Sequence, residues 1–377
     1  MVDLLESREK IDRIDKQIVD LFEERMRVAA DVAEYKRNTG KQVLDRAREQ
    51  SKLEVLQAMA SNEFNAVSIR ELFSQIMSMS RKLQYTLLAA NVEETFEELP
   101  ELAVEAGTKV VFFGVKGSYS EKAMLECFGE QVEGIPAATF QEVMEKIEQG
   151  EALYGVLPIE NTTTGGITDI YDLLVEYDNC IVAEHVVKID HALLAPMGAN
   201  VSDIQEIYSH PQALMQCENF FKEHPEITKV PAESTAKAAL YVAEMQDNTK
   251  AALAGAHVAN LYGLSVLQEQ VNTEAVNSTR FIVITKKRAY VKGANKISLC
   301  FELPHEAGTL YNILSHMIFN NLNMTKIESR PIAGKQFEYR FFVDFEGNLQ
   351  DAGVKNALTG IRAEAMSLRI LGNIHTS

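Results

Sequence analysis

Cysteine is scarce in this 377-residue chain, and its four cysteines lie far apart. They form no C-x-x-C pair, so neither a zinc site nor a disulfide framework is indicated, and we expect no metal. The simplest expectation is a set of buried thiols in a reducing cytoplasm. The residues are Cys127, Cys180, Cys217 and Cys300.

Basic residues are also in the minority. Lys and Arg number 37 against 54 Asp and Glu, which gives a formal net charge of −17. This balance argues against nucleic acid and against anionic membranes as partners, because both require a basic footprint. It does not exclude small anionic substrates, which need only local positive charge.

Long hydrophobic runs and a secretion signal are missing as well. No apolar stretch is long enough to span a bilayer, and the N-terminal sequence Met-Val-Asp-Leu-Leu-Glu lacks the basic start and apolar core of a signal peptide. Hydrophobic residues nevertheless make up 46% of the chain, whose length accommodates two or three domains. We therefore expect a cytoplasmic protein with several packed cores.

Residues 1–90 are expected to be all-helical. A first helix runs to about Arg37 and is ended by Asn38-Thr39-Gly40, Asp45 caps a second helix through about Ala60, and a third covers roughly residues 68–89. One helix is very long and the segment has little core of its own, so we expect dimerisation to bury its apolar seam. Residues 91–108, rich in glutamate around Pro100, are expected to be an acidic linker or a loosely held helix.

Residues 109–287 alternate between short buried strands and helices. This alternation indicates an α/β fold with mostly parallel sheets, in which ligands bind at the carboxyl ends of strands. The polar, glycine-rich segments 114–120, 158–166 and 209–212 follow such strands. The expected strands are 109–113, 153–157, 180–187, 206–208, 251–254 and 281–285, and the expected helices include 139–149, 211–223 and 234–245.

Residues 295–377 show a third pattern. The expected elements are a strand at 297–303, a helix at 307–320, strands at 322–329 and 337–345, a helix at 350–361 and an extended segment at 366–372. The order βαββαβ in about eighty residues is the ferredoxin-like plan.

A cation lies in the apolar seam of the first helix. Arg25 falls on the seam itself, with Arg8 and Lys36 at equivalent flanking positions. A buried, unpaired cation is costly, so Arg25 pairs with an acid on another helix, reaches out of the bundle, or meets an anionic ligand. Three cations on one side of the helix favour a small, multiply anionic ligand. The seam residues are Ile11, Ile14, Ile18, Leu21, Val28 and Val32.

The polar residues of this helical region resemble those of the AroQ-type chorismate mutases, spacing included. The resemblance implies that Arg25 and the partner chain's Arg8 hold the two carboxylates of chorismate. It also implies that Lys36 and Gln84 donate hydrogen bonds to the ether oxygen. Arg48 would support a carboxylate, and Glu49 with the backbone around Asp45 would take the substrate hydroxyl. Ser80 belongs to the same set, although Ser80 and Gln84 could also be satisfied polar groups of the core. The matching residues are Arg8, Arg25, Lys36, Asp45, Arg48, Glu49, Ser80 and Gln84.

Five blocks of the middle region resemble prephenate dehydratases. They are residues 116–120, 158–161, 209–212, 233–235 and 278–281, the last containing the Thr279-Arg280-Phe281 triplet. The resemblance implies two α/β lobes with a cleft between them, the second lobe at about 190–268. It assigns to Thr279 a hydrogen bond that assists departure of hydroxide from prephenate. Thr279 could instead merely begin a strand, and His210 could be structural. The residues expected to line the cleft are Asn161, Ser209, Gln212, Gln216, Thr235 and Arg280.

Two motifs of the last region resemble an ACT regulatory domain of the phenylalanine-binding kind. They are Gly308-Thr309-Leu310, at a strand–helix junction, and Glu328-Ser329-Arg330-Pro331, after a strand. The resemblance implies L-Phe binding by these residues. Thr309 replaces the usual alanine of the first motif, and an inert dimerisation module remains the alternative.

In this order, the three regions resemble the family of bifunctional chorismate mutase–prephenate dehydratases. The resemblance implies domains at 1–90, 109–287 and 295–377, with the linker at 91–108. It further implies two consecutive reactions from chorismate to phenylpyruvate, inhibition by L-Phe, no cofactor or metal, and a homodimer or tetramer. Two alternatives remain: a phenylalanine-sensing scaffold with a dead site, disfavoured because the polar residues are present, and a dehydratase that prefers arogenate.

Overall fold

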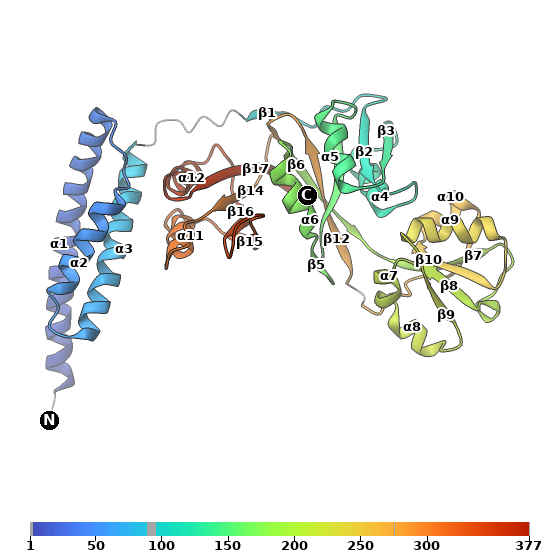
Figure 1. Ribbon diagram of the computed structural model, residues 1–377, viewed down its shortest axis with the longest axis horizontal. Helices are drawn as coiled ribbons and strands as arrows, with labels where there is room; N and C mark the ends of the chain where they lie inside the picture. Colours follow the sequence, from blue (N-terminus) through green and yellow to red (C-terminus); the bar gives the residue numbers. More distant parts are fainter. Residues whose placement is uncertain (1–2, 89–95, 275, 377) are drawn as a thin grey trace. The chain divides into compact units, whose positions relative to one another are not determined.

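The computed structural model describes residues 3–88, 96–274 and 276–376 (Figure 1). The chain forms two compact units. Residues 1–94 and 299–369 belong to the first unit, and residues 95–298 and 370–377 belong to the second.

Three helices open the first unit: α1 (Leu4–Thr39), α2 (Arg46–Ala58) and α3 (Glu63–Leu88). Gly40 ends α1 with φ 68°, and the Asp45 side chain caps α2 by accepting a hydrogen bond from the Arg48 amide at 3.1 Å. The third helix begins at Glu63 rather than at 68. The reason is that the Asn62 side chain accepts a hydrogen bond from the Asn65 amide at 2.8 Å and thereby provides an earlier cap.

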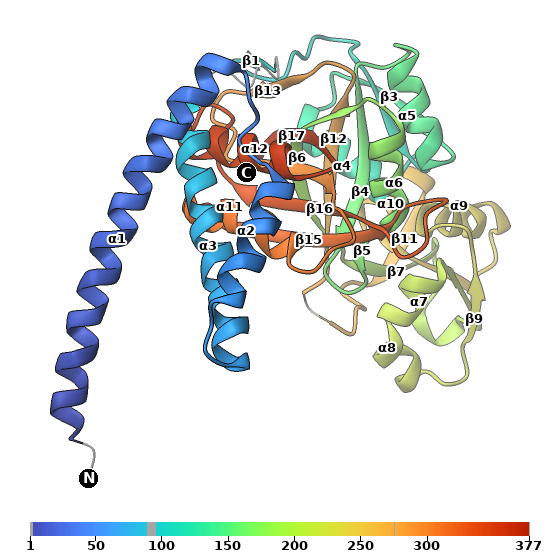
Figure 2. The ribbon, with the colours of Figure 1, turned by 60° about the vertical axis from the view of Figure 1, so that its left-hand side comes forward.

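The apolar seam of α1 does not pack within this chain. Only Ala29 and Ala33 of α1 are buried, and α1 diverges from α3 toward its N-terminus (Figure 2). The exposed seam residues are Ile11, Ile14, Ile18, Leu21 and Val28. The single chain leaves this seam exposed because α3 covers only the alanine side of α1, and burial of the seam by dimerisation stays a prediction.

The C-terminal part follows the expected order βαββαβ. Its elements are β14 (Lys296–Glu302), α11 (Thr309–Phe319), β15 (Met324–Pro331), β16 (Tyr339–Glu346), α12 (Ala352–Glu364) and β17 (Ser367–Thr376). The strand order is β15-β16-β14-β17. Within the first unit, α3 packs against both α11 and α12.

A sheet of the second unit has the order β17-β6-β12-β4-β2-β3. Its strands pair in mixed directions, because β12 runs antiparallel to both β4 and β6, whereas β2 is parallel to β3 and β4. β12 enters this sheet directly after the second lobe, with no crossover helix. The elements are β2 (Lys109–Phe113), α4 (Tyr119–Phe128), β3 (Glu133–Ala137), α5 (Phe140–Glu148), β4 (Tyr154–Asn161), β5 (Gly165–Gly166), α6 (Thr168–Glu176), β6 (Cys180–Lys188) and β12 (Ser278–Thr285).

The second lobe is a five-stranded sheet between two helical layers, with strand order β11-β7-β10-β8-β9. The expected helix at 211–223 is two helices that meet at Cys217, and β7 and β11 pair antiparallel, which corrects the expectation of mostly parallel strands. The elements are β7 (His191–Pro196), the 3-10 turn Val201–Asp203, β8 (Glu206–Ser209), α7 (Pro211–Gln216), α8 (Glu218–Glu223), β9 (Thr228–Pro231), α9 (Thr235–Met245), β10 (Lys250–Gly255), α10 (His257–Tyr262) and β11 (Leu264–Gln268).

The expected linker is partly a strand. β1 (Glu97–Leu99) pairs parallel with β13 (Ala289–Val291), so this stretch is neither linker nor helix. Glu93 and Glu94 lie outside the described residues. In the described ranges, none of the helices combines the length and apolar character needed to traverse a lipid bilayer.

Candidate active sites

A cavity of about 980 Å³ lies among α1, α2, α3 and the segment that joins α1 to α2. Every polar residue predicted for the helical site lines this cavity, except Arg8. These residues come from three consecutive helices and from the segment before α2, and the fold brings them to one cavity. The lining includes Arg25, Lys36, Asp45, Arg48, Glu49, Ser80 and Gln84.

Arg25 is half-buried at the cavity wall. Its guanidinium donates hydrogen bonds to the Ser80 hydroxyl and, at 3.4 Å, to the Ile76 carbonyl. It forms no ion pair with any described residue. Burial lowers the pKa of Arg25, and the charge of Glu49 acts in the opposite direction. Arg25 is therefore a positioned cation with neutral partners, which suits an anionic ligand.

Lys36 and Gln84 meet on another side of the cavity. The Lys36 ammonium donates to the Gln84 Oε1 atom at 3.1 Å and to the Val43 carbonyl at 2.7 Å. Burial and the neighbouring charge of Arg48 lower the pKa of Lys36. Because the Gln84 carbonyl is occupied by Lys36, its amide N–H groups are available to donate to a ligand.

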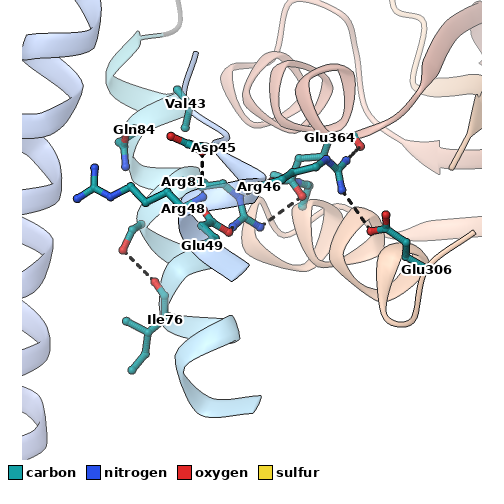
Figure 3. A network of polar contacts seen from close by, with 12 residues as sticks. Val43, Asp45, Arg46, Arg48, Glu49, Ile76, Arg81, Gln84, Glu306 and Glu364 are labelled. Carbon is teal, nitrogen blue, oxygen red and sulfur yellow. Dashed lines mark hydrogen bonds and ion pairs between the residues drawn. The ribbon is translucent and has the colours of Figure 1, made fainter. Parts of the chain in front are cut away.

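Glu49 reaches the cavity from the first turn of α2. Its Oε2 atom accepts a hydrogen bond at 2.5 Å from Arg81, a buried residue of α3 (Figure 3). Arg81 was not predicted from the sequence. Its position directly after Ser80 on α3 gave no usable signal, because adjacent residues of a helix point in different directions.

Arg8 does not reach the cavity of its own chain. It is exposed on α1, seventeen residues before Arg25, which corresponds to about 25 Å along a helix. The seam residues around it are exposed too, as described above.

A second cluster forms where β4 and β12 pair. Thr279 lies opposite Asn161 in the register, and both are buried. The Asn161 Nδ2 atom donates to the Thr279 hydroxyl at 2.9 Å, and the Asn161 Oδ1 atom accepts from the Thr163 hydroxyl at 2.6 Å. The Thr279 hydroxyl proton has no acceptor among the described residues, so it is available to a ligand.

Helix α7 of the second lobe contributes to the same cluster. Gln216 donates to the Thr163 hydroxyl at 2.9 Å, and Gln212 donates to the Thr164 hydroxyl at 3.0 Å. The predicted residues Asn161, Gln212, Gln216 and Thr279 therefore belong to one hydrogen-bonded arrangement.

Ser209 and Thr235 lie at strand and helix ends of the second lobe. The buried Ser209 hydroxyl donates to the Leu253 carbonyl at 2.6 Å. Thr235 is half-buried in the first turn of α9. His210 caps α7, with its Nδ1 atom accepting from the Gln212 amide at 3.3 Å, which agrees with a structural role.

The structure does not bring Arg280 to the cluster. Neighbouring residues of a strand point to opposite faces, so Arg280 faces away from Thr279. Its guanidinium pairs with Glu160 at 2.6 Å and with Glu184 at 3.0 Å. These two carboxylates already compensate its charge, which the sequence motif alone does not reveal.

The whole chain matches known enzymes. Residues 7–85 match the family model for chorismate mutase type II, and residues 110–289 match the model for prephenate dehydratase. Bifunctional chorismate mutase/prephenate dehydratases of Enterobacter agglomerans and Escherichia coli K12 are each 33% identical, covering 98% of this chain and 95% of theirs. The protein of that name from Aquifex aeolicus is 31% identical, over 99% of this chain and 98% of its own.

The chain belongs to this bifunctional family. It is an enzyme with chorismate mutase and prephenate dehydratase activities, as the sequence resemblance predicted.

Solved structures resemble about 71% of the chain. A prephenate dehydratase from Arthrobacter aurescens in complex with L-Phe has a TM-score of 0.66 at 31% identity, covering 71% of this chain and 90% of its own. A protein described as GqqA, a quorum-quenching acylase, also has a TM-score of 0.66, at 29% identity over 71% of this chain and 98% of its own.

His191 adjoins the cluster where β4 and β12 pair, and the sequence did not reveal it. Its Nε2 atom lies 3.1 Å from the Gln216 Oε1 atom, and its Nδ1 atom lies 3.2 Å from the Tyr119 hydroxyl. Burial lowers the pKa of His191, so the ring is neutral at neutral pH. We infer that it orients Gln216. Nothing in the sequence around it distinguished it from a residue that begins a buried strand.

The predicted effector residues separate into two groups. Gly308 precedes α11 with φ 82°, and Thr309 and Leu310 line a hollow of about 360 Å³ together with aromatic residues at the start of β16. Glu328, Ser329 and Arg330 lie on β15 and do not line that hollow.

Proposed function

We propose that the two activities act in sequence, in phenylalanine biosynthesis. The helical site rearranges chorismate to prephenate, and the α/β cleft converts prephenate to phenylpyruvate, water and CO2. The meeting of Arg25, Lys36 and Gln84 around one cavity carries the proposal, because cations and neutral donors are what a dicarboxylate with a breaking ether bond requires.

In the mutase step, the site holds a reactive conformer and stabilises developing charge. Arg25, oriented by Ser80, and Arg8 of the partner subunit bind the two carboxylates, since guanidinium forks match carboxylates. Lys36 and Gln84 donate to the ether oxygen as it gains negative charge. The substrate hydroxyl is received by Glu49 and by the backbone near Asp45, while Arg48 supports a carboxylate. No nucleophile or proton transfer is needed.

In the dehydratase step, aromatisation drives the loss of CO2 and the ring hydroxyl. Thr279 donates its free hydroxyl proton in a hydrogen bond to the departing hydroxide, and Asn161 holds the Thr279 oxygen in place. Gln212 and Gln216 complete the cleft with Ser209 and Thr235. Short polar groups of this kind bind an anionic substrate without burying many charges.

We further propose that residues 295–377 form a ferredoxin-like ACT domain that binds L-Phe and inhibits the dehydratase. The structure of the Arthrobacter relative in complex with L-Phe and the hollow beside Thr309 and Leu310 support this. Residues 328–330 would complete the effector site across a subunit interface. Titration calorimetry with L-Phe on the intact chain should detect binding; no heat of binding would favour an inert dimerisation module.

The proposed domains are residues 1–90 for the mutase and 109–287 for the dehydratase, in a cytoplasmic homodimer or tetramer. The exposed seam of α1 and the distance of Arg8 from its own cavity support association of two chains. The free cysteines, of which Cys180, Cys217 and Cys300 are buried, support a reducing compartment.

Two variants test the assignment of the sites. Arg25→Ala should lose mutase activity by about 100- to 1000-fold, because one positioned donor to the reacting anion is removed, and should still convert prephenate. Thr279→Val should lose dehydratase activity, keep mutase activity and therefore accumulate prephenate from chorismate. Separate assays with chorismate and with prephenate measure both. An Arg25→Ala protein with normal mutase turnover, or a Thr279→Val protein that makes phenylpyruvate at the parent rate, would contradict the assignment.

A further inference from the structure

Three cations of α2 and α3 contact the C-terminal helices α11 and α12. Arg46 donates to the Glu364 carbonyl at 2.8 Å, and the Lys82 ammonium donates to the Ser315 hydroxyl at 2.8 Å. The Arg81 Nε atom donates to the Glu364 Oε1 atom at 2.8 Å (Figure 3). Of these three cations, only Arg81 also pairs with Glu49.

Glu364 is a buried anion whose carboxylate contacts both Arg81 and His316. Its side chain is 7% exposed, as is that of Arg81, and the His316 Nε2 atom lies 3.2 Å from its Oε1 atom. Burial alone would raise the pKa of Glu364, but contacts with His316 and the charge of Arg81 outweigh burial and lower the pKa to about 2. The carboxylate is therefore ionised at neutral pH, and the Arg81 guanidinium is fixed against it.

The fixed guanidinium in turn holds Glu49. Glu49 is 27% exposed at the edge of the cavity, where a free glutamate side chain would sample several rotamers. A guanidinium can bind two carboxylates at once because its N–H groups form a planar fork. In Arg81, the Nε–H group donates to Glu364 and an Nη1–H group donates to Glu49.

We propose that Glu364, in the C-terminal part of the chain, is a positioning residue of the mutase site: acting through Arg81, it fixes the carboxylate of Glu49. The inference rests on the proposed role of Glu49 in receiving the hydroxyl of chorismate. The mutase site is then completed by a residue that follows it by about 280 positions.

Glu364→Gln tests the proposal because it keeps the shape of the side chain and removes its charge. Glu49 contacts the substrate hydroxyl before and during the reaction, so a misplaced Glu49 weakens both states. We expect KM for chorismate to rise about tenfold, with kcat nearly unchanged, as for coupled residues of one network. KM reports only on the folded enzyme, so partial loss of folded protein would lower the apparent kcat and leave KM unchanged.

Arg81→Lys is a second variant, in case Glu364→Gln folds poorly. It keeps a positive charge but cannot form the fork to both carboxylates, so KM should rise here as well. Ser315→Ala is the matched control, because it removes a buried hydrogen bond between the same two parts of the chain without touching Glu49. Its KM should equal that of the parent. An equal rise in KM for Ser315→Ala would overturn the proposal and indicate general loosening.

Glu49→Gln, measured alone and combined with Glu364→Gln, shows whether Glu364 acts through Glu49. If Glu364 acts through Glu49, the double variant should have the KM of Glu49→Gln alone. If Glu49→Gln raises KM and Glu364→Gln does not, the proposal is overturned while the role of Glu49 stands. If Glu49→Gln itself has no effect on mutase kinetics, the proposed role of Glu49 fails, and this inference fails with it.

Discussion

The proposed role of Gln84 makes a prediction about how mutase activity depends on pH. The Gln84 carbonyl accepts a hydrogen bond from Lys36, which leaves the amide N–H groups available for the proposed hydrogen bond to the ether oxygen, and an amide does not titrate. A carboxylic acid at the same position could donate only when protonated.

We therefore predict that Gln84→Glu confines mutase activity to acidic pH, whereas the parent turnover varies little from mildly acidic to neutral pH. The measurement is kcat for chorismate across this range. The Gln84→Glu protein loses activity as pH rises because the glutamate ionises. A parent enzyme whose turnover falls steeply over the same range would show that a titrating group, and not Gln84, supplies the key hydrogen bond.

At the scale of single residues, the residues predicted for the helical site line one cavity, apart from Arg8, but the hydrogen bonds among them were not predicted. Arg25 was identified because a cation in an apolar seam requires an anion, and the structure places it at a cavity with neutral partners. Arg81 and His191 were missed because their roles depend on contacts between distant segments. Arg280 was placed in the cleft from its motif, yet two carboxylates hold it on the other face of β12.

At the scale of helices and strands, the ion pair between α3 and α12 should make stability depend on pH. Glu364 has a pKa of about 2 in the folded protein against an ordinary value of 4.5. A lowered pKa means that its contribution to stability is fully present above pH 4.5 and is lost as the pH falls toward 2.

Glu364→Gln should accordingly unfold at a lower temperature than the parent near neutral pH, and the difference should shrink as the medium is acidified. The measurement is the thermal unfolding of both proteins at a series of pH values. Glu306→Gln is the control, because Glu306 forms an exposed ion pair with Arg46 at 3.7 Å. Its loss should change the unfolding temperature little. A difference between Glu364→Gln and the parent that stays constant down to acidic pH would contradict the assigned pKa.

Elements with a strong local pattern were predicted well, and those defined by distant pairing were not. The last residue of α1 follows from Gly40 and the first residue of α2 follows from Asp45, because each cap acts within one helical turn. The antiparallel strands β7 and β11 depend on neighbours elsewhere in the chain, and a run of buried residues does not reveal strand direction. The apolar seam of α1 is exposed in the single chain, and its predicted burial by dimerisation stays a prediction.

At the scale of the whole molecule, we expect each mutase site to need two chains. If Arg8 comes from the partner, mixing Arg8→Ala with Arg25→Ala creates hybrid dimers in which one of the two sites has both arginines. Random subunit exchange should restore about a quarter of the parent mutase activity. Mixing Arg25→Ala with Lys36→Ala is the control, because both residues belong to the same chain's site and no hybrid site is intact. Absence of any recovery in the first mixture would show that Arg8 is not shared.

The C-terminal residues are part of the second compact unit and pair with its sheet. Residues 370–377 belong to the compact unit of the dehydratase, where Gly372 pairs with Ile181 of β6, and Lys296 pairs with Glu184 at 2.7 Å. Removing residues 295–377 would expose the edge of β6, so studies of L-Phe control are better made on the intact chain.

We propose that this protein, with no other enzyme, converts chorismate through prephenate to phenylpyruvate without cofactor or metal. The most direct measurement is to incubate the purified protein, treated with a chelator, with chorismate alone and to follow chorismate, prephenate and phenylpyruvate over time. We predict that chorismate disappears, prephenate passes through a maximum or stays low, and phenylpyruvate accumulates to match the chorismate consumed. Consumption that stops at prephenate, or no consumption at all, would contradict the account.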